Sequence, residues 1–432
     1  MSILSSLYNG ASGMLAQSAG ITVIGDNIAN INTIGFKASR GTFSDVLGLT
    51  VTNGGGQPTQ IGLGVRFAGA EQVFTQGSFA NTGQVTDMAI DGEGFFVVRG
   101  QHRGQSGQFY TRAGTFHLDQ NNVLVNRENM QVMGFPPGVG AASTTAMGPL
   151  QLGAQTMPPR ATDKVELSAA LDSRAATPPA FNVLDAAATS SASSSLPVYD
   201  SLGAAHNMQI YFRNTGVNGT WEWYGAMDGA ELQGGLAGTP QVVARGTMVF
   251  TNTGALAQQT TAQNTIQFKA AAPNQVVNFD FGDAIAQGGT GQKGSTAVAQ
   301  STSIKRSAQD GYAAGEFTQM TIGGNGVVTA AFSNGQRQDL GQIAVAGFSA
   351  EQGLRREGGT LWSSAPESGE AVIGAAGSSG HGQIISGALE LSNVDLADQF
   401  VQMIAYQRGF QANSKTIQTS DDNYVTLVQL RR

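Results

Sequence analysis

The chain has 432 residues, no cysteine, 59 glycines and only 12% charged side chains, with a formal net charge of −7. The lack of cysteine excludes disulfides, thiolate metal sites and cysteine nucleophiles, and the acidic balance without a basic patch argues against a nucleic-acid partner. No apolar run reaches the roughly 18 residues of a membrane span. The length predicts two or three domains, and abundant glycine with few charges favours β structure with many turns.

The first 36 residues predict a helix that packs against another helix. Apolar residues recur every seven positions along two neighbouring lines, which hold Leu7, Met14, Ile21 and Ile28, and then Ile24 and Ile31. Helix propensity is lowered by up to ~1 kcal/mol at each of the glycines Gly10, Gly13, Gly20 and Gly25. We therefore expect this segment to be disordered in a single chain and to fold on assembly. The alternative is a helix docked on its own domain.

After this helix the pattern changes to β structure. Residues 37–70 contain glycine-rich stretches and look irregular, which predicts a connector. The run from Met88 to Val98 has the pattern of strand, tight turn and strand, with Asp91-Gly92-Glu93-Gly94 as the turn. We expect residues 71–146 and 300–385 to form a middle β domain.

The composition shifts between these two segments. Ala, Thr, Ser and Pro dominate after residue 139, and strand signals then return, as in Thr220-Trp221-Glu222-Trp223-Tyr224. We expect an outer β domain over 147–299. The alternation of aromatic and polar residues at Trp221, Trp223 and Tyr224 is typical of a half-buried strand, although exposed aromatic residues here would also suit a binding module.

The C-terminal segment carries the strongest helix signal. It has no helix breaker from 393 to 432 apart from Gly409, and Ser392 or Asn393 can cap its start. Asp395 and Asp398 suit the first turns, where the helix dipole favours anions. A helix of about 40 residues is about 60 Å long, so another helix must cover its apolar stripe, which consists of Leu389, Leu396, Met403, Phe410, Ile417 and Tyr424.

Together these elements predict an α+β fold. Residues 1–36 and 386–432 would form paired terminal α-helices in a coiled-coil-like inner domain, with two mainly antiparallel β domains inserted in nested order. We predict no enzyme, no cofactor and no metal site, because no catalytic constellation is present and the histidines lack metal-ligand spacing, at His102, His117, His206 and His381.

Two motifs resemble the signatures of the bacterial flagellar rod and hook family. The N-terminal motif comprises Asn27, Ala29, Asn30, Asn32, Thr33, Gly35, Phe36 and Lys37. The C-terminal motif comprises Ser392, Asn393, Val394, Asp395, Gln407, Arg408, Gln411 and Asn413. Ser386-Gly387-Ala388-Leu389-Glu390 and the run from Met88 to Phe96 also match. The resemblance is close over 1–135 and 300–432 and loose over 147–299.

The resemblance implies a structural subunit of the flagellar hook, because distal rod proteins of the family lack a large domain such as 147–299. Such subunits form a curved, flexible tube that transmits torque from rod to filament and encloses the export channel. The terminal helices would pack between subunits through Leu7, Met14, Ile21, Ile24, Ile28, Ile31, Leu396, Phe400, Met403, Phe410, Ile417, Tyr424 and Leu427. A distal-rod-like axial protein of the basal body and a surface adhesin or binding module remain alternatives.

The family also implies partners and a location. The partners would be further copies of the chain, the distal rod, the hook cap, the hook–filament junction proteins and the flagellar type III export apparatus, with no nucleic acid and no membrane insertion. The location would be the extracellular bacterial flagellum, reached without a cleaved signal peptide. No Lys or Arg precedes Lys37, which is unlike a secretory signal peptide.

Overall fold

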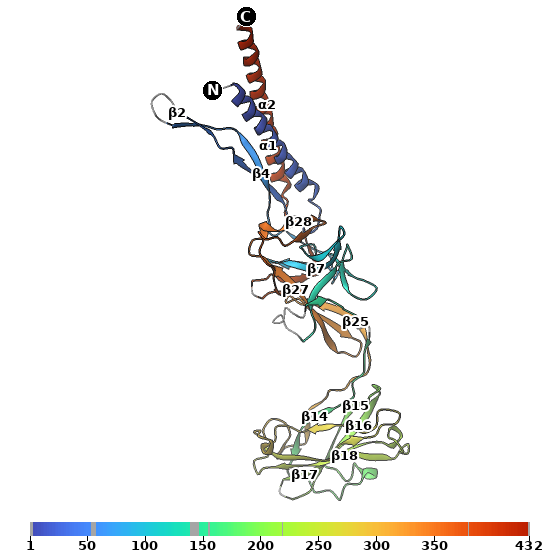
Figure 1. Ribbon diagram of the computed structural model, residues 1–432. Helices are drawn as coiled ribbons and strands as arrows, with labels where there is room; N and C mark the ends of the chain where they lie inside the picture. The colour runs from blue at the N-terminus through green and yellow to red at the C-terminus, as the bar shows by residue number, and fades with distance from the viewer. Residues whose placement is uncertain are drawn as a thin grey trace. The chain divides into compact units, whose positions relative to one another are not determined.

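The computed structural model describes residues 3–52, 58–138, 147–153, 156–217, 219–378 and 380–430. The chain forms two compact units (Figure 1). Unit 1 comprises Met1–Gly153, Gln319–Ala331 and Arg337–Arg432, and unit 2 comprises Ala154–Thr318 and Phe332–Gln336. As the sequence predicts, terminal helices accompany a mainly antiparallel β-rich body.

The two long helices belong to unit 1. Helix α1 (Ile3–Ala29) and helix α2 (Leu396–Leu430) lie side by side (Figure 1). Helix α1 also packs on strands β1 (Ser39–Asp45) and β4 (Val65–Gln72). The structure therefore shows the alternative to disorder, a helix docked within its own chain. Tertiary packing offsets the poor helix propensity of its glycines.

The start of α2 differs from the prediction. The helix begins at Leu396, and its N-cap is Asp395, whose Oδ1 accepts hydrogen bonds from Ala397 N at 2.7 Å and Asp398 N at 3.3 Å. Neither Ser392 nor Asn393 caps it, because the side chain of Asn393 makes tertiary contacts instead. Leu389 is not helical either, since it lies in strand β32 (Ala388–Glu390).

The expectation of irregular chain over 37–70 is wrong for the described residues. Strand β1 pairs antiparallel with β4, and β2 (Leu49–Thr52) pairs antiparallel with β3 (Pro58–Ile61). The prediction gave too much weight to glycine and too little to the alternation of side chains along these strands. Phe43 and Phe67 meet edge to face across the pair, with ring centroids 5.8 Å apart.

The β body of unit 1 is built on one antiparallel path of strands. Along β7, Phe96 and Val98 join one buried cluster, whereas Phe95 and Val97 join another. Since successive side chains point to opposite faces, both faces of this sheet are covered, which explains the continuous apolar run. The path is β26 (Val327–Phe332), β27 (Arg337–Gly347), β11 (Gln131–Phe135), β7 (Phe95–His102), β8 (Gln105–Thr111), β29 (Leu361–Ser363) and β28 (Arg355–Gly358).

Shorter elements complete unit 1. Four strands branch from the main path, namely β9 (Phe116–Leu118), β10 (Leu124–Asn126), β12 (Gly148–Pro149) and β30 (Val372–Ala375). Two further pairs are β5 (Phe79–Asn81) with β32, and β6 (Met88–Asp91) with β31 (Gln383–Ser386). A 3₁₀ turn is η5 (Glu351–Gly353).

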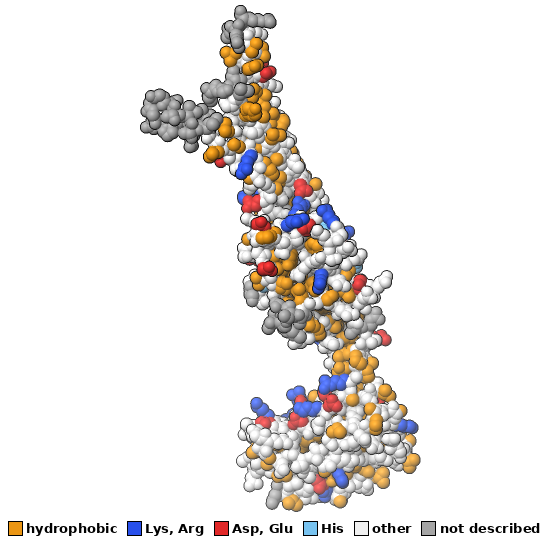
Figure 2. All heavy atoms as spheres, viewed as in Figure 1, with side chains coloured by type: hydrophobic (Ala, Val, Ile, Leu, Met, Phe, Trp, Pro, Cys, Tyr) orange, Lys and Arg blue, Asp and Glu red, His pale blue; other side chains and the backbone are white. Residues whose placement is uncertain are grey.

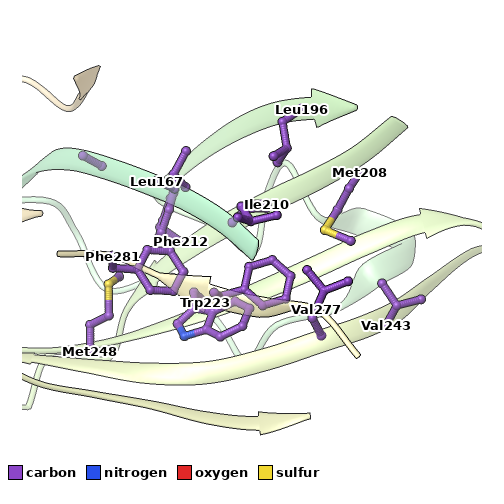
Figure 3. Packing of buried hydrophobic residues seen from close by; sticks show 14 of the residues in the cluster. Leu167, Leu196, Met208, Ile210, Phe212, Trp223, Val243, Met248, Val277 and Phe281 are labelled. Atoms are coloured by element: carbon purple, nitrogen blue, oxygen red, sulfur yellow. The ribbon is translucent and has the colours of Figure 1, made fainter. Parts of the chain in front are cut away.

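Unit 2 encloses a large apolar core (Figure 3). Its main sheet is antiparallel, in the order β15 (Ala192–Tyr199), β16 (Ala205–Asn214), β17 (Thr220–Asp228), β18 (Pro240–Phe250) and β19 (Leu256–Gln263). Phe212, Trp223 and Phe281 meet in the core. Trp221 and Trp223 are 1% and 0% exposed, so the suggestion that they are exposed binding aromatics is wrong.

The remaining elements of unit 2 are short. Strand β14 (Lys164–Asp172) pairs in parallel with β22 (Asn278–Asp280) and β23 (Thr296–Val298), and antiparallel with β24 (Ser303–Gln309). The other elements are β13 (Thr156–Met157), β20 (Thr265–Ile266), β21 (Gln275–Val276), η2 (Val183–Asp185), η3 (Gly229–Glu231) and η4 (Ile285–Gln287). Strand β25 (Gly315–Ile322) contains the boundary between the units in the sequence.

Candidate functional site

A buried charge cluster lies in unit 1, where the segments that flank the two helices meet the β body. Lys37 Nζ is 2.7 Å from Glu390 Oε1, and Arg112 Nη1 is 3.4 Å from Glu390 Oε2. The three side chains are 1%, 2% and 0% exposed, in the order Lys37, Arg112, Glu390. Gly77 N also donates to Glu390 Oε1 at 2.9 Å, and Lys37 Nζ donates to Thr75 O at 2.8 Å. Each carboxylate oxygen of Glu390 therefore has a donor.

Burial controls the electrostatics of this cluster. Desolvation lowers the pKa of the Lys37 ammonium, although the neighbouring Glu390 carboxylate acts in the opposite direction. Desolvation also raises the pKa of the nearby Glu351 carboxyl, against the opposing effect of Arg112. Two cations share the single anion Glu390, so loss of its charge would leave two like charges buried together.

Asn27, near the end of α1, links the helix pair to strand β1. Its Oδ1 accepts a hydrogen bond from Ser39 N at 2.8 Å, and its Nδ2 donates to Ser39 O at 2.7 Å and to Gln399 Oε1 of α2 at 2.9 Å. Asn27 is 1% exposed and Gln399 is 8% exposed. All polar atoms of the Asn27 amide are thus satisfied inside the protein.

Asn393, just before α2, makes the matching link on the other terminal segment. Its Oδ1 accepts from Ala38 N at 2.7 Å, and its Nδ2 donates to Val73 O at 2.8 Å and to Thr75 O and Oγ1, both at 3.0 Å. Two asparagines from opposite ends of the sequence therefore hold the consecutive backbone units at 38 and 39. We define the polar junction as the set Asn27, Lys37, Arg112, Glu390, Asn393 and Gln399.

The seam between α1 and α2 is lined by small and polar residues. A Cβ atom at Gly13 would lie 2.5 Å from Asn413 Nδ2, and one at Gly20 would lie 2.8 Å from Tyr406 Cε2. With the Asn27–Gln399 hydrogen bond, these pairs show that positions rise along α1 as they fall along α2, so the helices are antiparallel. The glycines allow close approach of the helices, which is their structural role here.

The predicted heptad spacing is present, but on α1 the seam uses only one residue of the predicted apolar lines, Ile24. Along α1 the buried positions are Gly10, Gly13, Ala16, Gly20, Ile24 and Asn27. The first predicted line is only half-buried within one chain, at Leu7, Met14, Ile21 and Ile28, and Ile31 of the second line lies in the turn after α1, where it is also half-buried. Periodicity identifies an apolar stripe, but it does not say whether the stripe faces a partner helix in the same chain or in another.

The apolar stripe of α2 is mostly open. Met403 and Ile417 are half-buried. The exposed residues are Leu396 at 40%, Phe400 at 49%, Phe410 at 40%, Tyr424 at 55% and Leu427 at 53%. On α1, Leu15 is 74% exposed. Figure 2 shows hydrophobic side chains at the surface along the helix pair. These residues leave a large apolar area that no other described residue of the chain covers.

The other signature residues divide into a group that makes contacts inside unit 1 and a group that lies at its surface. In the first group, Asn30 closes the turn after α1, since it donates to Asp26 O at 2.8 Å and accepts from Thr33 Oγ1 at 3.1 Å. Gly35 has φ +68°, and a Cβ there would lie 2.5 Å from Ala113 N, so the position requires glycine.

The remaining signature residues differ in exposure. Phe36 and Val394 are buried, and Asn413 is half-buried against α1. The second group is exposed or half-exposed, at Ala29, Asn32, Ser392, Asp395, Gln407, Arg408 and Gln411.

Sequence reasoning missed two members of the polar junction. Arg112 follows strand β8 directly, and nothing in its local pattern indicates a buried cation. The position of Gln399 in the seam could have been predicted from its spacing. Gln399, Tyr406 and Asn413 recur every seven residues and form the line of α2 that faces α1. Glu390 occurs in the matched motif, but its pairing with Lys37, 353 positions away, is visible only in the fold.

The described residues hold neither a metal-binding group nor a membrane-spanning helix. The part of the chain that the structure describes holds no group of three or more His, Asp or Glu side chains placed to bind a metal ion. Within the same residues, no helix is both long enough and apolar enough to cross a membrane.

Comparisons with known proteins identify the family. Four family models match, described as flagella basal body rod protein over residues 7–37, flagellar hook protein FlgE/F/G D1 domain over 89–168, flagellar basal body protein FlaE D2 domain over 170–312, and flagellar basal body rod FlgEFG protein C-terminal over 385–430. The flagellar hook protein FlgE of Treponema pallidum is 36% identical, with 100% of each chain covered. That of Salmonella typhimurium is 34% identical, with 99% of this chain and 100% of the relative covered.

A solved structure supports the fold. The flagellar hook protein FlgE2 of Helicobacter pylori matches with a TM-score of 0.51 at 16% identity, covering 71% of this chain and 98% of that one. The long terminal helices, the β-rich body and the full-length relatives agree with one another. The chain therefore belongs to the family of bacterial flagellar hook proteins and is a structural subunit of the hook.

Proposed function

We propose that copies of this chain assemble into a curved, flexible tube through their terminal helices, and that the tube passes torque from the rod to the filament. In this proposal the helix pairs of many copies pack in a coiled-coil-like inner wall around the export channel. The β body of unit 1 forms a middle layer and unit 2 an outer layer, in nested order. The segment 37–70 connects the inner and middle layers.

One observation carries this proposal. The α1–α2 seam is built mainly from glycines and polar side chains, so most of the described large apolar residues of α2 are exposed and those of α1 other than Ile24 are at most half-buried. Removing apolar area of this kind from water lowers the free energy of the assembled state. Further copies of the same helix pair would supply the cover, and the heptad spacing of the stripe suits helical partners.

The test compares two substitutions on the exposed surface of α2. Phe400→Ser removes an apolar side chain that is 49% exposed, whereas Gln407→Ser changes an exposed polar side chain on the same helix. Purified chains are induced to polymerise and imaged by electron microscopy. We expect tubes from the unchanged chain and from Gln407→Ser, and few or none from Phe400→Ser. Equal assembly of all three would contradict the role of the apolar stripe.

We further propose that unit 2 slides against its neighbours as the tube bends. Its surface is rich in uncharged polar residues and glycine, which suit weak and exchangeable contacts. Replacing residues 154–318 by a short Gly-Ser linker should leave tubes that form but lose their curvature. Tubes with unchanged curvature and bending would remove this part of the proposal.

The family implies the remaining partners, and we propose them on that basis. The chain would contact the distal rod, the hook cap and the hook–filament junction proteins at the ends of the tube. It would reach the outside of the cell through the flagellar type III export apparatus, without a cleaved signal peptide. Recovery of the full-length, unprocessed chain from purified hooks, checked by mass spectrometry, tests the last point.

A further inference from the structure

The polar junction connects three separate parts of unit 1. Lys37 lies just after α1, Glu390 lies just before α2, and Arg112 comes from the β body directly after β8. Asn27, on α1, is hydrogen-bonded to the backbone of Ser39, and Asn393, just before α2, is hydrogen-bonded to the backbone of Ala38. Both covalent routes from the helix pair to the β body therefore pass through one set of buried polar contacts.

The chemistry of this set is poorly suited to stability alone. A buried ion pair loses most of its Coulomb gain to desolvation, and apolar side chains of similar volume are often as stabilising or more so. Arg112 even has a buried Nε without a hydrogen-bond partner among the described residues. What a charge cluster adds is directional: the carboxylate of Glu390 satisfies its donors in one arrangement of the three segments.

We propose that the polar junction fixes the rotational position of the helix pair on the β body, so that torque passes between them without local twisting. Lys37, Arg112 and Glu390 are then positioning residues. This inference rests on the proposed function as a torque-transmitting tube.

A surface contact between the same two parts provides a matched control. Arg356 Nη1 is 2.9 Å from Asp26 Oδ2, which joins β28 to the last turn of α1, and these side chains are 38% and 44% exposed. Ion pairs at such exposed positions contribute little, because water and salt screen them. Asp26→Asn therefore removes this ion pair between the helix pair and the β body without disturbing buried charge.

The experiment separates stability from positioning. Tubes are assembled from the purified full chain, fixed at one end, and their torsional compliance is read from the rotational fluctuation of a bead at the other end. The key variant combines Lys37→Met, Arg112→Met and Glu390→Leu, which keeps side-chain volume and removes all three charges. We expect its thermal unfolding temperature to fall only modestly, because Gly77 N loses its acceptor, while torsional compliance rises at least about twofold. Asp26→Asn should change neither quantity.

Other outcomes are equally decisive. The proposal is overturned if the triple variant forms tubes of unchanged compliance, or if Asp26→Asn raises compliance as much. Glu390→Gln provides a second variant, which should lower stability and raise compliance together. If neither charge variant assembles although Asp26→Asn does, the cluster acts in folding and the positioning role is wrong. If the unchanged chain forms no tubes, it is the proposed function that fails.

Discussion

The helix pair and unit 2 bury their side chains in opposite ways. Unit 2 buries a large core of Trp, Phe, Met and Leu side chains within one chain, although it also exposes apolar residues such as Leu184 and Leu236. The helix pair places Gly10, Gly13, Gly20 and Asn27 inside and leaves Phe400 and Leu427 exposed. Unit 2 therefore has a core of its own, whereas the helix pair has little apolar core between its helices, as expected if other copies cover it in the proposed tube. The following changes test that contrast, from the largest effect on the single chain to the smallest.

Trp223→Ala should have the largest effect, because it leaves a cavity in the core of unit 2. We expect the free energy of unfolding of unit 2 to fall by about 3–5 kcal/mol. Leu202→Ala, at a position 66% exposed in the same unit, should change it by no more than about 0.5 kcal/mol. Denaturant unfolding followed by fluorescence measures both. Equal effects would mean that the core of unit 2 is not self-contained.

Asn393→Ala should weaken the attachment of α2 to the β body. The substitution leaves Ala38 N without its acceptor and removes the donors to Val73 O and Thr75 O. We expect a loss of about 1–3 kcal/mol in the free energy of unfolding of unit 1. Gln411→Ala, at an exposed position of α2, is the control and should be nearly neutral. Hydrogen exchange at residues 36–40 would show the same order of effects.

Two glycine substitutions on α1 test the seam directly. At Gly20 a new side chain would meet the Tyr406 ring, which itself packs edge to face on Phe43, whereas nothing lies within 4 Å of a Cβ at Gly25. Gly20→Leu should destabilise the helix pair by about 1–3 kcal/mol through overpacking. Gly25→Leu should stabilise it by up to ~1 kcal/mol through helix propensity. Circular dichroism during thermal unfolding compares them, and destabilisation by both would argue against a tight seam.

Tyr224 provides the smallest effect, in unit 2. Burial, followed by the hydrogen bond to Glu222, raises the pKa of its phenol from 10.0 to about 12. The folded state thus favours the neutral phenol, so this stabilisation is present below about pH 10 and is lost as the pH rises towards about 12. Since the side chain is largely solvent-screened, the loss should be small.

Tyr224→Phe removes the titrating group from the same position. The variant should lose less unfolding free energy than the unchanged chain between about pH 10 and about pH 12. Phenolate absorbance during alkaline titration gives an independent check, because the phenol that ionises near pH 12 should disappear in the variant. An identical titration curve would show that Tyr224 is not the high-pKa group.

Much of the architecture could be predicted from local pattern. Heptad spacing indicated helices at both ends, and strand–turn–strand patterning indicated the two strands on either side of Gly92-Glu93-Gly94 and the β nature of both units. These two strands do not form a hairpin, because β6 pairs with β31 and β7 pairs with β8, β11 and β27. The prediction of irregular chain over 37–70 was wrong because it gave more weight to glycine content than to the alternation of side chains in strands such as β4. The predicted N-cap of α2 was wrong because Asn393 and Asp395 are both good N-cap residues, and only the tertiary contacts of Asn393 decide between them.

By itself, the sequence determined that two helical ends flank a β-rich body and that the family is that of flagellar axial proteins. Only the tertiary structure decided which line of each helix faces the other, and that Lys37, Arg112 and Glu390 meet. The physical reason is that hydrophobic periodicity is a local property that marks a face without naming its partner. Lys37 and Glu390 are 353 positions apart, and such a contact exists only after the β body has brought the two ends together.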